Sequence, residues 1–140
     1  MQIDLNEKIK GLRGEDVPKS FPMQKEIDKL PKNKSGQPDI SKLERETIGN
    51  VIFNCVANYI IRDKREGHYI NLIAQSVLSG GKVEFKDKIQ KFLMDVLDEQ
   101  TLMRKKVKNE KGEDKEEVSG LYHGWVIAQI SEAFGEKIEE

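Results

Sequence analysis

The sequence predicts a mainly α-helical fold: one compact domain of four helices, with a short N-terminal β-hairpin as a minor β element. Apolar residues recur at helical spacing in four separate segments. A weaker alternation marks the first part of the chain, where Ile3 and Leu5 can share one face of a strand. A length of 140 residues with 36% hydrophobic residues suits one hydrophobic core, so we expect a single domain over residues 1–140.

The N-terminal part of the chain lacks a helical pattern. Residues 1–22 are predicted as a β-hairpin or extended arm, because a Gly-Leu-Arg-Gly sequence typical of a turn follows Ile9. Residues 23–40 are predicted as a loop, since they contain Pro31 and Pro38. Within that loop, only the stretch MQKEIDKL has a spacing suited to two helical turns.

A helical core is predicted over residues 41–103. Ser41 followed by Glu44 has the spacing of a capping box, so we expect the first helix over about 42–63. Apolar side chains cover most of its circumference on a wheel of 100° per residue. A helix of that kind normally has neighbours on several sides, which predicts a central position in the domain.

Three more helices complete the predicted domain. One runs over about 68–79 and ends at Gly80, a residue favoured just after a helix. A short extended stretch, KVEF, leads into a third helix over 87–103, which has the cleanest amphipathic pattern in the chain. The last helix is expected over 119–136, with Ser119 as its N-cap.

Residues 104–118 are predicted as a charged mobile loop or a charged hairpin. Eleven residues of the stretch RKKVKNEKGEDKEE are charged, too many to bury in a core. Its basic start, formed by Arg104, Lys105, Lys106 and Lys108, is the candidate nucleic-acid contact. The acidic run that follows would partly neutralise these cations within a Debye length of about 8 Å, so a solvated segment is the favoured interpretation.

Three amides repeat inside the apolar stretch GNVIFNCVANYII. Asn50, Asn54 and Asn58 are four residues apart, so on a helix they span an arc of about 80°. Three interpretations are open: the amides hold irregular chain against the helix, lie at a half-exposed edge, or line a groove for a partner. The first is favoured, because a buried amide needs a hydrogen-bond partner.

The sequence has no signature of catalysis or metal binding. His68 and His123 lack the paired spacing of metal ligands, and Asp95 and Glu99 resemble the solvated face of a helix. Cys55 is the single cysteine, which excludes an intramolecular disulfide. We therefore expect neither an enzyme nor a bound cofactor or metal.

Charge and hydropathy limit the kinds of partner and the cellular location that we expect. The 24 basic and 25 acidic residues nearly cancel, so no global basic field attracts nucleic acid or anionic lipid. No stretch approaches the ~20 apolar residues that span a bilayer, and the first residues lack the apolar run of a signal peptide. These observations predict a cytoplasmic protein without a membrane partner.

Taken in order, the segments resemble those of a group of small proteins from tailed phages and prophages. Proteins of that group open with a short strand, a Leu-x-Gly-x-x-[Ile/Val]-Pro turn and a second strand. They continue with an Asn-rich apolar helix like IGNVIFNCVANYI, a Tyr-containing helix, and a short strand leading into a helix. They close with a helix like GLYHGWVIAQISEAFGE. The matching positions of the turn here are Leu12, Gly14, Val17 and Pro18.

Two segments depart from that pattern: the loop at 19–40 is longer here, and residues 104–117 resemble an insertion. The resemblance implies a phage or prophage origin and an α-rich fold, and it carries no catalytic residue over to this chain. The favoured function is that of a non-enzymatic accessory protein acting through protein–protein contact. It would serve virion assembly or bind a host factor, in the bacterial cytoplasm or on the virion. A small nucleic-acid-binding regulator is the alternative, and an enzyme comes third. The partner and the oligomeric state are left open.

Overall fold

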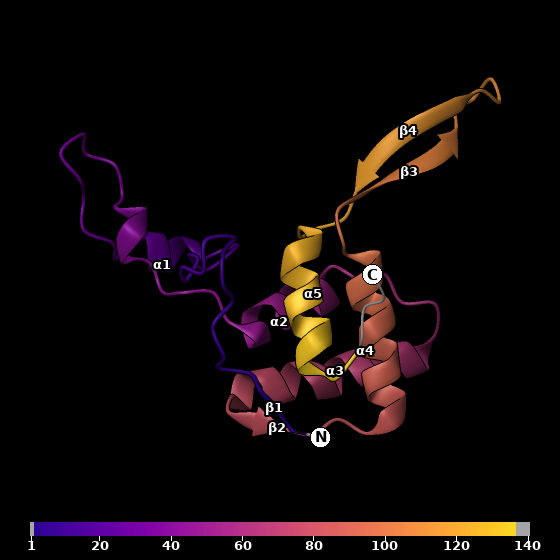
Figure 1. Cartoon of the computed structure of the whole chain (residues 1–140), viewed down its shortest axis with the longest axis horizontal. Helices are drawn as coiled ribbons and strands as arrows, with labels where there is room; N and C mark the ends of the chain where they lie inside the picture. The colour runs from indigo at the N-terminus through magenta and orange to yellow at the C-terminus, as the bar shows by residue number, and fades with distance from the viewer. Residues whose placement is uncertain (1, 137–140) are drawn as a thin grey trace.

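A computed structural model of the chain describes residues 2–136. Over this range the fold is mixed α+β with helices dominant, and two small antiparallel sheets accompany five α-helices (Figure 1). The helices are α1 (Gln24–Asp28), α2 (Ile48–Ala57), α3 (Lys64–Ser79), α4 (Asp87–Glu99) and α5 (Gly124–Ala133), with a short 3₁₀ turn at Ile40–Lys42. The strands are β1 (Ile3–Asp4), β2 (Lys82–Val83), β3 (Met103–Lys108) and β4 (Asp114–Ser119).

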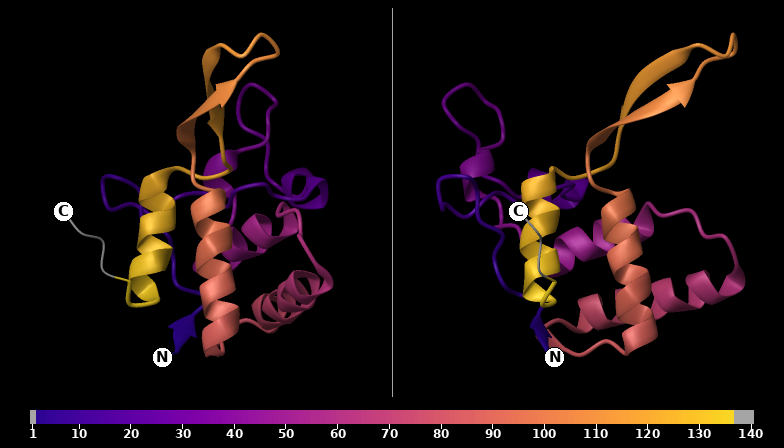
Figure 2. Two further views of the ribbon diagram at one scale, coloured as in Figure 1. Left: turned by 90° about the vertical axis from the view of Figure 1, so that its right-hand side faces the viewer. Right: turned by 45° about the vertical axis from the view of Figure 1, so that its right-hand side comes forward.

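The core lies among the four longer helices. Helix α2 packs on α3 and α4, while α4 also packs on α3 and on α5 (Figures 1 and 2). Six of the ten residues of α2 are buried, as expected for a helix with neighbours on several sides. Side chains with no exposed surface come from each of these helices: Val51, Ile52, Cys55, Ile73, Leu93, Val96, Leu97 and Ile130.

Helix α2 is shorter than the predicted helix over 42–63. It begins after Thr47, whose hydroxyl accepts the Asn50 N–H at 3.1 Å, so the predicted capping box lies upstream of the true start. The residues just before Thr47 are extended because they bond to the N-terminal arm. The Glu46 N–H, for example, donates to the Val17 carbonyl at 2.7 Å. Backbone pairing with a distant segment therefore overrides the local capping signal.

Some boundaries of the other helices also differ from prediction, by about four residues. Helix α3 begins four residues before the predicted position 68, with Asp63 as its N-cap, and it ends before Gly80 as predicted. Helix α4 begins at Asp87 as predicted but ends four residues early. Helix α5 begins after His123, so the predicted N-cap at Ser119 is wrong.

The predicted N-terminal hairpin over residues 1–22 forms only in part, as a short turn in which an antiparallel bridge joins Lys10 to Asp16 and the Gly11 N–H donates to the Glu15 carbonyl at 2.7 Å. Strand β1 pairs instead with β2, and Ile3 lies opposite Val83 in that antiparallel pair. The rest of the arm runs along the segment before α2, where isolated bridges join Lys8 to Thr47 and Pro18 to Arg45. The arm is thus held by tertiary pairing as well as by its own short turn.

Residues 103–119 form the charged hairpin, the second of the two forms considered from the sequence. Strands β3 and β4 pair in an antiparallel register that projects away from the helices (Figures 1 and 2). At its base, the Leu102 N–H donates to the Tyr122 carbonyl at 2.7 Å. Gly120 has a φ of +120°, and a β-carbon there would lie 2.3 Å from the Thr101 carbonyl oxygen. The close approach of the two chains at the base therefore requires glycine.

Candidate functional site

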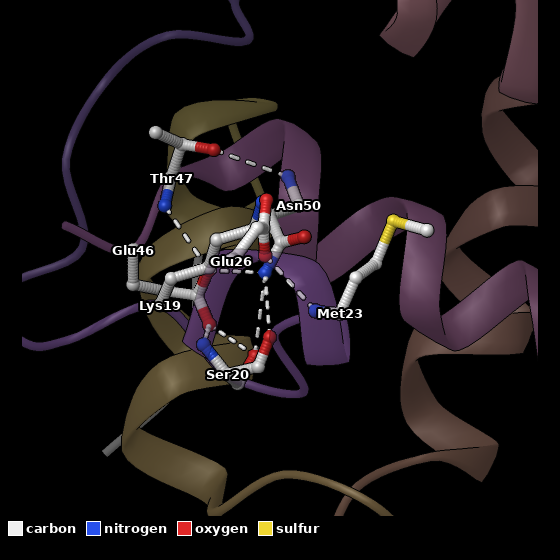
Figure 3. Close-up of polar contacts among 7 residues, drawn as sticks. All are labelled: Lys19, Ser20, Met23, Glu26, Glu46, Thr47 and Asn50. Atoms are coloured by element: carbon white, nitrogen blue, oxygen red, sulfur yellow. Dashed lines mark hydrogen bonds and ion pairs between the residues drawn. The ribbon is translucent and has the colours of Figure 1, made fainter. Parts of the chain in front are cut away.

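A buried polar network lies where the arm meets α2, and its centre is the carboxylate of Glu46. This side chain is only 2% exposed. One carboxylate oxygen accepts the backbone N–H of Ser20 at 2.9 Å and also the Ser20 hydroxyl; the other accepts the Asn50 side-chain amide at 2.6 Å and the Thr47 N–H at 3.2 Å (Figure 3). These donors compensate the cost of removing the carboxylate from water.

Tyr122 joins the network from the segment just before α5. Its hydroxyl shares a hydrogen bond with the Ser20 hydroxyl at 2.5 Å and accepts the Asn54 side-chain amide at 2.9 Å. Burial raises the pKa of Tyr122 to about 12, so the phenol is neutral at physiological pH. The network therefore ties together three parts of the chain that are far apart in sequence: the arm, α2 and the hairpin base.

A cleft of about 380 Å³ opens beside this network, between the arm, α2 and α3. Asn50 and Asn54 of α2 line it together with apolar side chains. Three of these apolar side chains are strongly exposed: Phe21 at 58%, Met23 at 59% and Leu78 at 77%. Large exposed apolar side chains grouped around a concave surface are typical of contact sites.

The backbone of Phe21 is strained. Its φ of +47° is the one positive value at a non-glycine residue among residues 2–136, and Pro22 follows it. A residue before proline disfavours helical φ and ψ, and a left-handed non-glycine residue costs about 1–3 kcal/mol. The hydrogen bonds of Ser20 to Glu46 hold the preceding residue, and the Phe21 ring meets the Tyr122 ring edge-on at 5.9 Å. The fold therefore places Phe21 on the cleft at an energetic cost. Backbone strain of this kind clusters at functional sites.

The structure brings two of the three predicted asparagines together. The Asn50 side-chain amide donates to the Ser20 carbonyl at 3.2 Å, which joins the arm to α2 as the favoured interpretation requires. Asn58 is exposed and lies apart from the cleft, and its side chain donates to the Asn54 carbonyl at the end of α2. Within residues 2–136, no donor pairs with the side-chain oxygens of Asn50 and Asn54, so both remain available as acceptors.

Sequence reasoning missed the residues that organise the cleft. Ser20, Phe21, Glu46 and Tyr122 are scattered over the chain and share no motif. Only the apolar setting of Asn50 pointed toward them, because a buried amide needs partners.

The predicted basic patch lies on β3, and each of its four side chains is exposed. Most of these cations face an acidic residue across the hairpin. Lys105 lies opposite Glu117 and Lys106 opposite Glu116, while the Lys108 ammonium is 3.5 Å from a carboxylate oxygen of Asp114. Arg104 lies opposite Val118. The positive charge of β3 is thus partly balanced by β4.

The two histidines and the cysteine make no side-chain hydrogen bond to the network in the described part of the chain. His68 and His123 are exposed, and the His123 ring stacks on Trp125. Burial raises the pKa of the Cys55 thiol to about 12, which keeps it protonated. In the described part of the chain, no group of three or more His, Cys, Asp or Glu side chains is arranged to hold a metal ion. Nor does any helix in residues 2–136 have the length and apolar character needed to cross a bilayer.

Comparison of the chain with protein-family models, with curated proteins and with solved structures gave no match. The resemblance to tailed-phage proteins therefore stays a prediction.

Proposed function

We propose that this chain is a non-enzymatic accessory protein of a phage or prophage that acts by binding another protein at the cleft between the arm, α2 and α3. The observation that carries the proposal is the exposed apolar rim of Phe21, Met23 and Leu78 beside a buried polar network. Exposed apolar side chains gain free energy when a partner covers them. Because the network is buried and hydrogen-bonded, the surface loses little conformational freedom on binding.

The chemistry of the network supports binding rather than catalysis. The Ser20 hydroxyl is held by Glu46 and Tyr122, and neither histidine is hydrogen-bonded to it as a base would be. The neutral Tyr122 phenol serves as a hydrogen-bonding group in the same network. Two of the polar side chains on the cleft, Asn50 and Asn54, offer amide oxygens that suit N–H donors of a partner chain.

The test compares two exposed leucines. Leu78 lies on the cleft, whereas Leu12 is 80% exposed on the arm and does not line it. Wild type, Leu78→Glu and Leu12→Glu are used to capture proteins from bacterial lysates made before and after phage infection. Each captured protein is then purified and titrated against all three forms.

We expect one partner to bind wild type and Leu12→Glu equally and to bind Leu78→Glu about tenfold more weakly, since a buried charge at an apolar contact costs at least 1.4 kcal/mol. Equal binding of Leu78→Glu would contradict the proposal. A partner made only after infection favours virion assembly, whereas one present beforehand favours host-factor binding.

A nucleic-acid-binding regulator is the second candidate, supported by the four exposed cations of β3. The facing acids of β4 weigh against it, because they balance part of the positive charge and repel phosphates. Mobility shifts on short duplexes at low salt decide between the two. Binding that falls steeply with salt would favour this candidate.

A further inference from the structure

The β3–β4 hairpin has two unpaired edges. It forms a two-stranded sheet of its own and projects away from the helices (Figure 2). A two-stranded hairpin is only marginally stable in water, and an exposed strand edge is a template for one more strand. Each edge of this hairpin is therefore a possible site of strand addition.

The phase of the hairpin ladder shows which backbone groups face outward on β3. At the tip, the Asn109 N–H donates to the Glu113 carbonyl at 3.0 Å, which makes these two residues a hydrogen-bonded pair. Antiparallel ladders alternate hydrogen-bonded with non-hydrogen-bonded pairs. In the observed register, the N–H and C=O groups of Arg104, Lys106 and Lys108 therefore point away from β4, toward the free edge.

The charge of β3 selects the kind of strand that this edge accepts. The three residues with outward backbone groups are all cationic and share one face, and β3 contains no acidic residue. The opposite face carries Met103 and Val107, one on each side of Lys105. A strand that alternates acidic and apolar residues would set carboxylates beside the cations and apolar side chains beside Met103 and Val107.

A second copy of this chain fits the edge poorly. Pairing β3 with β3 would oppose cations, and pairing β4 with β4 would oppose Asp114 and Glu116 with their own copies. Antiparallel pairing of β3 with β4 of another copy places both helical bodies at the same end. Strands two apart are only about 9.6 Å from each other, less than the width of one helix with its side chains. The bodies, each several helices wide (Figure 2), would collide.

We propose that the outer edge of β3 binds an extended acidic segment of another protein by strand addition. Lysines on an edge repel strands in general, and the same charges attract an acidic one. This surface is separate from the cleft of the proposed function, so either one can fail without the other.

The test uses full-length protein and two synthetic peptides of about eight residues, one alternating glutamate with valine and one alternating lysine with valine. Affinity is measured at about 50 mM salt, and amide hydrogen exchange reports which residues the peptide protects. We expect the acidic peptide to bind at least about tenfold more tightly than the basic one. It should slow exchange at Arg104, Lys106 and Lys108.

Three variants separate strand addition from simple charge attraction. Lys106→Pro removes an outward N–H that the hairpin itself does not use, and Lys106→Ala removes the charge but keeps that N–H. Glu116→Pro is the matched change on the outer edge of β4. We expect Lys106→Pro to weaken peptide binding about tenfold. The loss of affinity in Lys106→Ala should be several-fold smaller, and Glu116→Pro should bind the peptide nearly as tightly as wild type.

Several results would overturn the proposal. They are absence of binding to the acidic peptide, binding without protection of the β3 edge, and equal losses in Lys106→Pro and Glu116→Pro. Wild-type dimers that dissociate in Lys106→Pro would assign the edge to a second copy instead. If Lys106→Pro unfolds the hairpin, the protection pattern of the wild type decides by itself.

Discussion

The arm–α2 network and the β3–β4 hairpin use the same kinds of side chain in opposite surroundings. In the network, donors from Ser20, Thr47 and Asn50 surround the buried carboxylate of Glu46. In the hairpin, Lys108 and Asp114 pair in water, with side chains 74% and 80% exposed. Water screens an exposed ion pair, whereas a buried carboxylate leaves its donors unsatisfied when it is lost. The difference indicates that the network stabilises the fold and that the hairpin's charges are available for contacts.

The largest expected effect comes from removing the centre of the network. Glu46→Ala should lower the free energy of unfolding by about 3 kcal/mol, because buried donors of Ser20 and Asn50 lose their acceptor. The matched hairpin change, Glu116→Ala, should alter it by less than about 0.5 kcal/mol. Urea denaturation measures both. Similar values for the two variants would remove the distinction between the regions.

The base of the hairpin should be the next most sensitive place. Gly120→Ala should cost about 2 kcal/mol, since its φ of +120° is strained for alanine and the β-carbon would meet the Thr101 carbonyl. Gly112→Ala at the tip, where φ is +77° and no atom lies within 4 Å of the added carbon, should cost about 1 kcal/mol. Urea denaturation gives the free energies, and amide exchange across β3 and β4 shows whether the pairing survives. If Gly112→Ala lowered the free energy of unfolding as much as Gly120→Ala, the close contact at the base would not be what makes Gly120 sensitive.

Tyr122→Phe should have a smaller effect, about 1 kcal/mol near neutral pH, because Asn54 loses one acceptor. The pKa of Tyr122 is raised from 10.0 to about 12, so the folded protein holds this proton more tightly than the unfolded chain. The tyrosine's contribution is therefore fully present below pH 10 and is lost as the pH rises toward 12.

The alkaline fall in stability should be shallower in Tyr122→Phe but not absent, because burial also raises the pKa of Cys55. Urea denaturation at a series of alkaline pH values gives the comparison. Identical slopes for the variant and the wild type would show that burial does not hold the phenol neutral.

Local patterns in the sequence predicted the parts of the fold that local interactions specify. The amphipathic spacing located α3 and α4, and the end of α3 at Gly80 and the start of α4 at Asp87 are confirmed. The dense charge after residue 103 indicated a segment outside the core, with a hairpin as one of two forms. Of the candidate site, Asn50 and Asn54 were identified, because amides in an apolar setting need partners.

The tertiary structure decided what depends on contacts between distant segments. It pairs β1 with β2, which lie about eighty residues apart, and it lays the arm along the residues before Thr47. That pairing moves the start of α2 and brings Ser20 to Glu46. Helical periodicity is a property of neighbouring residues and can be read from the chain. A hydrogen-bond network among residues 20, 46 and 122 exists only after the chain has folded, because no local pattern relates its members.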